Sequence, residues 1–444
     1  MKTIDIKETP INHDIVKRII QECKIPNVGK ASIREIKKII DLIQNATGEK
    51  FIRMEMGIPG LPASEVGINA EIEALKKGVA AIYPDIQGIP PLKEETARFC
   101  KLFLDIDANP EYCFPTVGSM QGGFASMMTV NRLYEGKNKT LFLDPGFPVH
   151  KVQAQVMGID YESFDVYDYR GDKLHDKLES YLAKGDISSI LYSNPNNPSW
   201  ICFTDKELRI IAELANKYNV IILEDLAYFA MDFRKDYSQP GEPPYQPTVA
   251  KYTDNYILLI SSSKAFSYAG QRIGMMVISP KIYTTRSLAL KRFYHSDIFG
   301  TAMLFGTIYV LGAGVCHSAQ YALAAIFKAA NNGELNFVEQ VKVYGKKAKV
   351  MKKLFTDNGF NIVYDKDEDV PVSDGFYFTV AYPGLSGDEL VEEFMYYGIS
   401  AISLSITGSS RLEGVRACTS LIQEEQFPLL EERLKIFHQN HPLI

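Results

Sequence analysis

Short apolar runs alternate with helix-like segments through the middle of this chain. The runs cover residues 140–143, 187–193, 220–223 and 256–260. Apolar runs of this length between turn signals are typical of buried strands. Repeated strand–loop–helix units predict a mostly parallel sheet covered by helices. We therefore expect an α/β fold whose large domain is built on such a sheet.

A polar or aromatic residue lies just past the predicted end of each of these strands. These residues are Phe147, Asn197, Asp225 and Lys264. In open α/β sheets, ligands bind beyond the carboxyl ends of the strands. Four candidates at one edge of the sheet predict a ligand site there.

The segment after the last of these strands, residues 261–274, reads SSSKAFSYAGQRIG. Lysine is rarely buried without a partner or a function, and its amine can form a Schiff base with a carbonyl when its pKa is lowered. Arg272 follows Lys264 and has a guanidinium shaped to bind phosphate. Hydroxyls, amine and guanidinium together favour an aldehyde that carries a phosphate, such as pyridoxal phosphate. The alternative is a turn with a solvated lysine and arginine.

Three other segments are candidate ligand loops. Residues 116–122 form a turn that opens a helix, where free backbone N–H groups attract phosphate. Residues 57–62 and 83–90 are loops by composition. Gly57 lets the backbone approach a ligand, although a plain connecting loop explains the segment equally well.

The pattern changes after about residue 295. Strands are predicted at 375–380 and 415–419, and helices at 388–396 and 424–437. This arrangement predicts a second, smaller α+β domain. We expect residues 1–50 to join the small domain, 51–295 to form the large domain and 296–444 the small domain.

Composition excludes several classes of function. The 444 residues carry a net charge of −6 without a basic stripe, so no nucleic-acid partner is expected. The six cysteines lack metal-type spacing, which predicts free thiols in a reducing compartment and no metal site. The first residues show no apolar signal segment. We expect a cytoplasmic protein.

One long segment, residues 298–327, has no Asp, Glu, Lys or Arg. It is long enough to cross a bilayer. His317 and Gln320 lie inside it, and no basic cluster flanks it. A buried core or a subunit interface is therefore favoured over a membrane span.

Taken in order, these motifs resemble those of the class I/II aminotransferases, which are pyridoxal-phosphate enzymes of fold type I. Ser261-x-Ser263-Lys264 followed by Gly270-x-Arg272-x-Gly274 matches the lysine signature of that family. Asn197-Pro198 and Asp225-x-Ala227-Tyr228 match two further elements. The resemblance extends from about Ser32 to the C-terminus.

The resemblance implies roles around the ring of the cofactor, pyridoxal 5′-phosphate. Lys264 would hold the cofactor as a Schiff base and then move the proton at the substrate α-carbon. Asp225 would pair with the pyridinium nitrogen. Asn197 and Tyr228 would hydrogen-bond the phenolic oxygen of the ring, and Phe147 would stack on it.

The resemblance also implies how the phosphate and the substrate are held. The phosphate would bind the backbone amides of Ser119 and Met120 and the side chains of Ser261, Ser263 and Arg272. Tyr83 would reach the phosphate of a neighbouring subunit, which implies a homodimer with shared sites.

On the substrate side, Arg416 would bind the α-carboxylate together with Asn197. Arg411 is a nearby rival for this role. The backbone of Gly57 or Ile58 would approach the substrate.

The chain departs from the family at Ser199-Trp200, where Thr-Gly is usual. A bulky tryptophan there is expected to reshape access to the site or substrate preference. Together with Phe147, it gives a modest preference for an aromatic or apolar substrate.

The expected activity is transfer of an amino group from an L-amino acid to a 2-oxo acid by a ping-pong mechanism. A C–S β-lyase, or another eliminating enzyme on this scaffold, would use the same cofactor residues. A third hypothesis is that the protein is a non-catalytic ligand sensor. Residues 1–50 show no basic helix-turn-helix and Lys264 is intact, which argues against the sensor.

Overall fold

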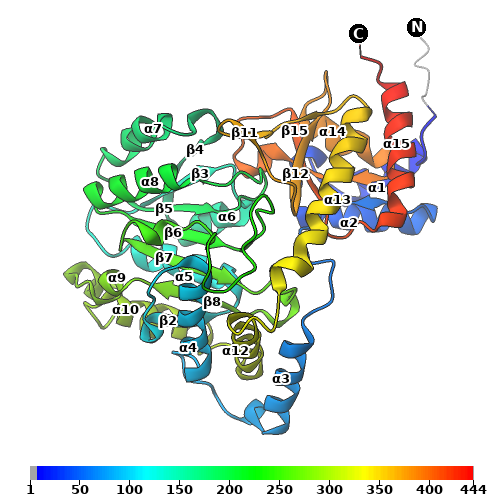
Figure 1. Ribbon diagram of the computed structural model, residues 1–444. Coiled ribbons are helices and arrows are strands. Elements are labelled where there is room, and N and C mark those ends of the chain that lie inside the picture. The colour runs from blue at the N-terminus through cyan, green and yellow to red at the C-terminus, as the bar shows by residue number, and fades with distance from the viewer. Residues whose placement is uncertain (1–7, 444) are drawn as a thin grey trace.

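The computed structural model describes residues 8–443 and has two parts that lie side by side in Figure 1. The larger part is built on a seven-stranded sheet and the smaller on a four-stranded sheet. The predicted α/β architecture with a smaller α+β part is confirmed. The limits at residues 50 and 295 stay predictions.

The large sheet is mostly parallel, as predicted, with strand order β2-β8-β7-β6-β5-β3-β4. Within this sheet, as the structure describes it, β8 alone runs opposite to the other strands. The strands are β2 (Cys113–Thr116), β3 (Lys139–Asp144), β4 (Asp160–Asp165), β5 (Ile187–Ser193), β6 (Ile221–Leu226), β7 (Tyr256–Ser261) and β8 (Gly274–Ile278). The sequence analysis did not identify β2, β4 or β8.

Strand β6 is longer than predicted, so Asp225 lies inside it and not beyond its end. The strand was predicted to end at residue 223 because the charged Glu224 interrupts the apolar run. Its carboxylate is buried but satisfied, because it accepts hydrogen bonds from Thr248 Oγ1 at 2.5 Å and Tyr192 Oη at 3.2 Å. A satisfied buried carboxylate lets the strand continue through the core.

Helices cover both faces of the large sheet. Along β7, Leu258 and Ile260 belong to one apolar cluster, whereas Ile257 and Leu259 belong to another on the opposite face. Burial on both faces explains why these strands are continuous apolar runs. One cluster includes residues of α4 (Pro90–Phe99), α7 (Lys173–Leu182), α8 (Asp205–Tyr218) and α12 (His317–Asn331). The other includes residues of α5 (Gly118–Val130), α6 (Pro148–Met157) and α9 (Pro280–Thr284).

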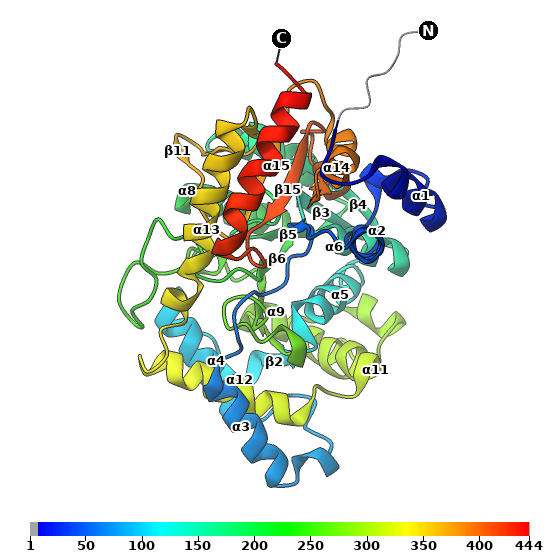
Figure 2. The ribbon, with the colours of Figure 1, turned by 90° about the vertical axis from the view of Figure 1, so that its right-hand side faces the viewer.

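The smaller part combines the two ends of the chain. Its antiparallel sheet has the order β14 (Ile402–Ser403), β15 (Gly414–Cys418), β12 (Tyr377–Ala381) and β9 (Asn361–Ile362). From the C-terminal end of the chain it contains the helices α13 (Phe337–Asp357), α14 (Gly387–Tyr396) and α15 (Phe427–Asn440). The N-terminal α1 (His13–Cys23) and α2 (Ile33–Thr47) lie beside them in both views (Figures 1 and 2) and share their apolar core.

Residues 51–56 alternate like a strand in the sequence, but the structure forms only the short β1 (Ile52–Arg53), which pairs with β13 (Ile399–Ser400). The chain leaves this pairing at Met54, whose N–H makes a last hydrogen bond to the Ser400 carbonyl at 3.0 Å. The Met54 carbonyl accepts a hydrogen bond from the Cys418 N–H at 3.0 Å. These bonds carry the following loop, with Gly57, toward the large part.

The segment without charged residues forms α10 (Phe299–Thr301), η9 (Ala302–Ile308), α11 (Tyr309–Gly312) and most of α12. Among residues 8–443, the structure contains no helix whose length and apolar character would suffice for a membrane span. Helix α3 (Glu65–Lys76) lies beside α12 at the lower end of the molecule in Figures 1 and 2.

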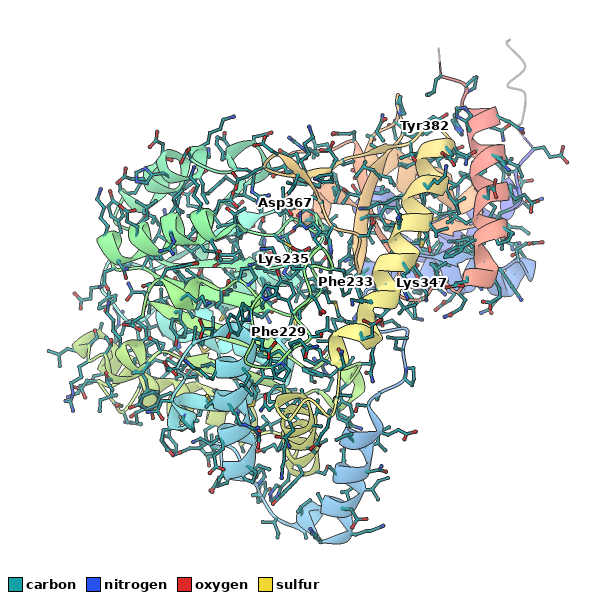
Figure 3. All side chains as sticks on the ribbon, viewed as in Figure 1. Phe229, Phe233, Lys235, Lys347, Asp367 and Tyr382 are labelled. Carbon is teal, nitrogen blue, oxygen red and sulfur yellow. The ribbon has the colours of Figure 1, made fainter. Side chains whose placement is uncertain are left out.

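Buried charges join the two parts. Asp367, in the hairpin of β10 (Lys366–Asp367) and β11 (Val370–Pro371), lies between the parts in Figure 3. Its carboxylate accepts hydrogen bonds from Arg170 Nη1 and Arg234 Nη2, both at 2.8 Å, and from the Cys202 N–H at 3.0 Å. Removing one partner of such a cluster leaves uncompensated buried charge.

We expect Asp367→Ala to lower the free energy of unfolding by about 3 kcal/mol, because the buried Arg170 and the partly exposed Arg234 each lose one of two carboxylate partners and the Cys202 N–H loses its acceptor. Asp357→Ala is the matched control, since Asp357 pairs with Lys353 on the exposed surface of α13. The control is expected to cost less than about 1 kcal/mol. Urea unfolding of both variants measures the difference, and equal losses would contradict this role for Asp367.

Candidate active site

The topology brings the predicted site residues to one edge of the large sheet. Ser193 at the end of β5 pairs with Asp225, and Ser261 at the end of β7 pairs with Gly274. Because β8 is antiparallel, it starts at this same edge, where Gly274 also pairs with Thr116 at the end of β2. The loops and turns that carry the candidate side chains therefore leave the sheet at neighbouring points.

Lys264 points its amine toward the loop after β1. Its Nζ donates a hydrogen bond to the Gly57 carbonyl at 2.6 Å and lies 5.8 Å from the ring centroid of Phe376. Burial lowers the pKa of Lys264 to about 8, and the charges of Arg272 and Arg416 act in the same direction. A lysine with this pKa has an appreciable fraction of free amine near neutral pH, which is the form that attacks a carbonyl.

Asp225 is buried, and its two carboxylate oxygens differ. Oδ2 lies 3.4 Å from His150 Nε2, whereas Oδ1 has no hydrogen-bond partner among the described residues. An unpaired buried carboxylate oxygen calls for an explanation. A protonated ring nitrogen of a ligand would supply the missing donor, so the site fits a pyridinium ring at this point.

His150 was not identified from the sequence. Its Nδ1 lies 3.2 Å from Gln153 Oε1, and Gln153 Nε2 donates to the Met120 carbonyl at 3.0 Å. His150 also lies edge-on to Phe147, with ring centroids 5.6 Å apart. Its position three residues after Phe147, in the first turn of a helix that follows a strand end, was the available signal.

The start of α5 offers free backbone donors. Val117 caps the helix without a side-chain hydrogen bond in the described structure, so the first-turn amides, including those of Ser119 and Met120, remain free. The guanidinium of Arg272 lies against this turn. Gly118 has φ +65°, and a Cβ there would lie 2.7 Å from Arg272 Nη2. Glycine therefore permits the contact between helix start and guanidinium.

Two serines lie beside this turn. Ser261 is the buried last residue of β7, and its Oγ accepts a hydrogen bond from the Ser263 N–H at 3.1 Å. Free amides, hydroxyls and an exposed guanidinium fit a phosphate group.

Arg416 lies at the other end of the site and is buried. Its Nη1 donates to Asn197 Oδ1 at 3.2 Å and its Nη2 to the Glu55 carbonyl at 2.6 Å, while Nε lacks an acceptor within residues 8–443. The rival Arg411 forms an ion pair with Asp168 at 2.5 Å. The geometry therefore favours Arg416 over Arg411 as a carboxylate ligand.

Tyr228 and Trp200 lie side by side in the wall behind Asn197. Tyr228 Oη is 2.9 Å from Tyr377 Oη, and burial raises the pKa of Tyr228. Trp200 has 0% of its surface exposed, and its Nε1 donates to Ser373 Oγ at 3.0 Å. The expectation that the Trp200 ring itself reshapes access to the site is wrong, because a wholly buried ring does not border an entrance.

Three further predicted residues lie on loops, Gly57 and Ile58 after β1 and Tyr83 after α3. Tyr83 is 90% exposed. The Gly57 carbonyl is occupied by Lys264 Nζ, and the Ile58 carbonyl accepts a hydrogen bond from Ser420 Oγ at 2.5 Å. A single subunit thus gives Tyr83 no visible role in the site.

Comparisons with known proteins show which family the chain resembles. A family model described as "Aminotransferase class I and II" matches residues 49–381. A probable aspartate aminotransferase of Methanocaldococcus jannaschii is 25% identical over 264 residues, which are 60% of this chain and 64% of that protein. Aromatic-amino-acid aminotransferase 2 of Thermococcus litoralis is 28% identical over 246 residues, 54% of this chain and 60% of that protein. The matched segments thus span less than two thirds of these relatives.

Solved structures share the fold. The aspartate aminotransferase of Thermotoga maritima has a TM-score of 0.74 at 18% identity, with 95% of this chain and 99% of that chain covered. An aminotransferase from Mycobacterium tuberculosis has a TM-score of 0.74 at 14% identity, with 92% and 96% covered. At these identities the likeness concerns the fold alone.

The low pKa of Lys264 is directly measurable. We expect labelling of Lys264 by a small acylating reagent to rise with pH through a midpoint near 8, against about 10.4 for a lysine in a model peptide. Mass spectrometry of the digested protein gives the midpoint, and Lys264→Arg identifies the labelled peptide. A midpoint equal to that of the model peptide would contradict the effect of burial.

Proposed function

Because this chain belongs to the class I and II aminotransferases, we propose that it is a pyridoxal-phosphate-dependent enzyme that transfers an amino group from an L-amino acid to a 2-oxo acid. Transfer would follow a ping-pong order, in which the first oxo acid leaves before the second binds. The observation that carries the proposal is the placement of Lys264, with its low pKa, at the same sheet edge as Asp225, whose Oδ1 has no hydrogen-bond partner among residues 8–443.

The residues at this edge fit each portion of the cofactor. Pyridoxal phosphate, when bound, supplies an electron sink that stabilises negative charge at the substrate α-carbon. Asp225 would hold the ring nitrogen and keep it protonated, and Phe147 would stack on the ring. Asn197 and Tyr228 would bind the phenolic oxygen. The phosphate would bind Ser119, Met120, Ser261, Ser263 and Arg272.

Lys264 is the base that the chain offers for the proton at the substrate α-carbon. Its amine is held by the Gly57 carbonyl and its pKa is about 8. A base with a pKa near the working pH both accepts and returns a proton readily.

Arg416 would bind the α-carboxylate and orient the α-carbon. Its guanidinium is buried, and its Nε still lacks an acceptor in the described chain. A carboxylate of the substrate would satisfy this donor and meet the guanidinium as a charge-assisted pair. Asn197 is in contact with Arg416 and would belong to both the cofactor and the substrate side. The backbone of Gly57 and Ile58 would border the substrate.

The choice of substrate stays open beyond an L-amino acid. The names of the relatives cover aspartate, aromatic amino acids, LL-diaminopimelate and nicotianamine. The modest preference for an aromatic substrate rested on Trp200 and Phe147, and the burial of Trp200 removes one of these two grounds.

A homodimer with shared sites belongs to the same proposal. Exposed apolar side chains gather on α3, η9 and α11 and in the loop after α3, a pattern that marks contact surfaces. They are Ile68, Ile72, Leu75, Ile82, Tyr83, Phe305, Tyr309, Val310 and Leu311. A second copy of the chain is the partner we propose, with Tyr83 reaching the partner's phosphate site.

The half-reaction tests transfer against elimination. We expect protein loaded with pyridoxal phosphate to absorb visible light, and some L-amino acid, added alone, to abolish the band lastingly with release of one oxo acid per site. A band that returns as ammonia accumulates would establish the β-lyase alternative. Lys264→Ala is expected to lose the visible band, and a band unchanged in this variant would refute the role of Lys264.

Mixed dimers test the shared site. Lys264→Ala and Tyr83→Ala subunits, each of low activity alone, should regain about a quarter of wild-type activity after mixing, because each hybrid of a two-fold dimer rebuilds one intact site. Size-exclusion chromatography with light scattering confirms that dimers form. Mixtures no more active than their parents would show that Tyr83 does not act across subunits.

A further inference from the structure

One buried side chain touches both ends of the site. Tyr377, the first residue of β12, has its Oη 2.9 Å from Tyr228 Oη. Its ring centroid lies 4.5 Å from the guanidinium carbon of Arg416. Tyr228 belongs to the cofactor end of the proposed site and Arg416 to the carboxylate end.

The register of the small sheet explains the contact with Arg416. Strands β12 and β15 are antiparallel, and Thr379 pairs with Arg416. Tyr377 lies two residues before Thr379, so its side chain is on the same face and diagonal to Arg416. Diagonal neighbours are within reach of aromatic and long side chains.

The hydroxyl of Tyr377 also abuts the loop that holds Lys264. A Cβ at Gly57 would overlap Tyr377 Oη, so the hydroxyl lies directly against that backbone. The Gly57 carbonyl in turn accepts the hydrogen bond from Lys264 Nζ. Tyr377 therefore contacts the three segments that carry Tyr228, Arg416 and Gly57.

Trp200 and Phe376 hold Tyr377 in place. Trp200 meets Tyr228 and Tyr377 edge-on, at centroid distances of 5.4 and 6.0 Å and interplanar angles of 70° and 71°. Phe376 lies 5.5 Å from Tyr228 and 5.0 Å from Tyr377. Edge-to-face packing of buried rings restricts their rotation. This gives Trp200 a structural task at the position where the chain departs from its family.

Proton counting decides the direction of the hydrogen bond between the two tyrosines. A phenol has a single proton to donate. Once Tyr228 donates its proton to the phenolic oxygen of the cofactor, Tyr377 must be the donor across the 2.9 Å contact. Donors in such a chain strengthen one another.

We propose that Tyr377 is a positioning residue that acts through Tyr228, strengthening its hydrogen bond to the cofactor while its ring supports Arg416. The inference rests on the proposed function. It assigns two separable contributions to one side chain, the hydroxyl toward the cofactor and the ring toward the carboxylate.

Tyr377→Phe removes the hydroxyl and keeps the ring. A weaker hydrogen bond from Tyr228 would leave more negative charge on the phenolic oxygen of the cofactor. The nitrogen of Lys264, joined to the cofactor beside that oxygen, would then hold its proton more tightly. We expect the pH midpoint of the visible band of the loaded protein to rise by about 0.5 to 1 unit, the size of one lost hydrogen bond. We also expect kcat to fall about threefold to tenfold with KM for the amino acid unchanged.

A double-mutant cycle shows whether the effect passes through Tyr228. Tyr228→Phe should itself raise the midpoint, and adding Tyr377→Phe should then cause no further rise, because coupled residues are not additive. Tyr377→Leu is a second variant. It loses the ring as well, so it should raise both the midpoint and KM.

Tyr382→Phe is the matched control. Tyr382 is a buried tyrosine just after β12 whose Oη is 2.8 Å from His438 Nδ1, and it lies far from the boundary between the parts in Figure 3. The Tyr382→Phe variant should leave the pH midpoint of the visible band unchanged.

Each result separates the hypotheses. Unchanged midpoints in both Tyr377 variants, additive shifts in the cycle, or an equal shift in Tyr382→Phe would overturn the role of Tyr377 while the visible band of the wild type upholds the proposed function. A wild-type protein that forms no visible band would overturn the proposed function, and this inference with it.

Discussion

The buried guanidinium of Arg416 joins segments that are far apart in the sequence. It donates to Asn197 of the large part and to the Glu55 carbonyl of the N-terminal chain, while its own strand belongs to the small part. A charged group inside a protein is costly unless its donors are satisfied. Its demand for acceptors therefore fixes how the loop after β1, the turn after β5 and the small sheet meet. These two hydrogen bonds tie the small sheet to the large part and to the N-terminal chain at the site.

Local sequence signals predicted much of this fold. Ser32–Glu35 and Thr204–Glu207 have the spacing of capping boxes in the sequence. They mark the starts of α2 and α8, and both reciprocal hydrogen bonds are present at each. The apolar run at 187–193 coincides with β5. These signals depend on residues that are close in the sequence, so they can be recognised without the structure.

Other features depend on partners that sequence patterns do not name. The short β1 ends where Met54 turns to Cys418, and β6 continues because Thr248 and Tyr192 satisfy Glu224. The motifs singled out Asp225 and Arg416 as candidates, whereas Tyr377 carries no local signature and His150 only its position three residues after Phe147. Their contacts with Asp225 and Tyr228 come from tertiary packing. Trp200 is the opposite case. Its unusual position beside a motif suggested a role in substrate access, but its complete burial indicates a role in packing.

The antiparallel strand β8 has a consequence for how such a protein can change. Lys264 and Arg272 lie in one connection whose ends, Ser261 and Gly274, are paired within the large sheet. The spacing between amine and guanidinium is thus set inside one part of the molecule. Arg416 and Tyr377 reach the site from the other part. In the proposed function, the lysine and the phosphate ligands would belong to one scaffold and the main ligand of the substrate carboxylate to the other, so over evolutionary time one could drift while the other is conserved.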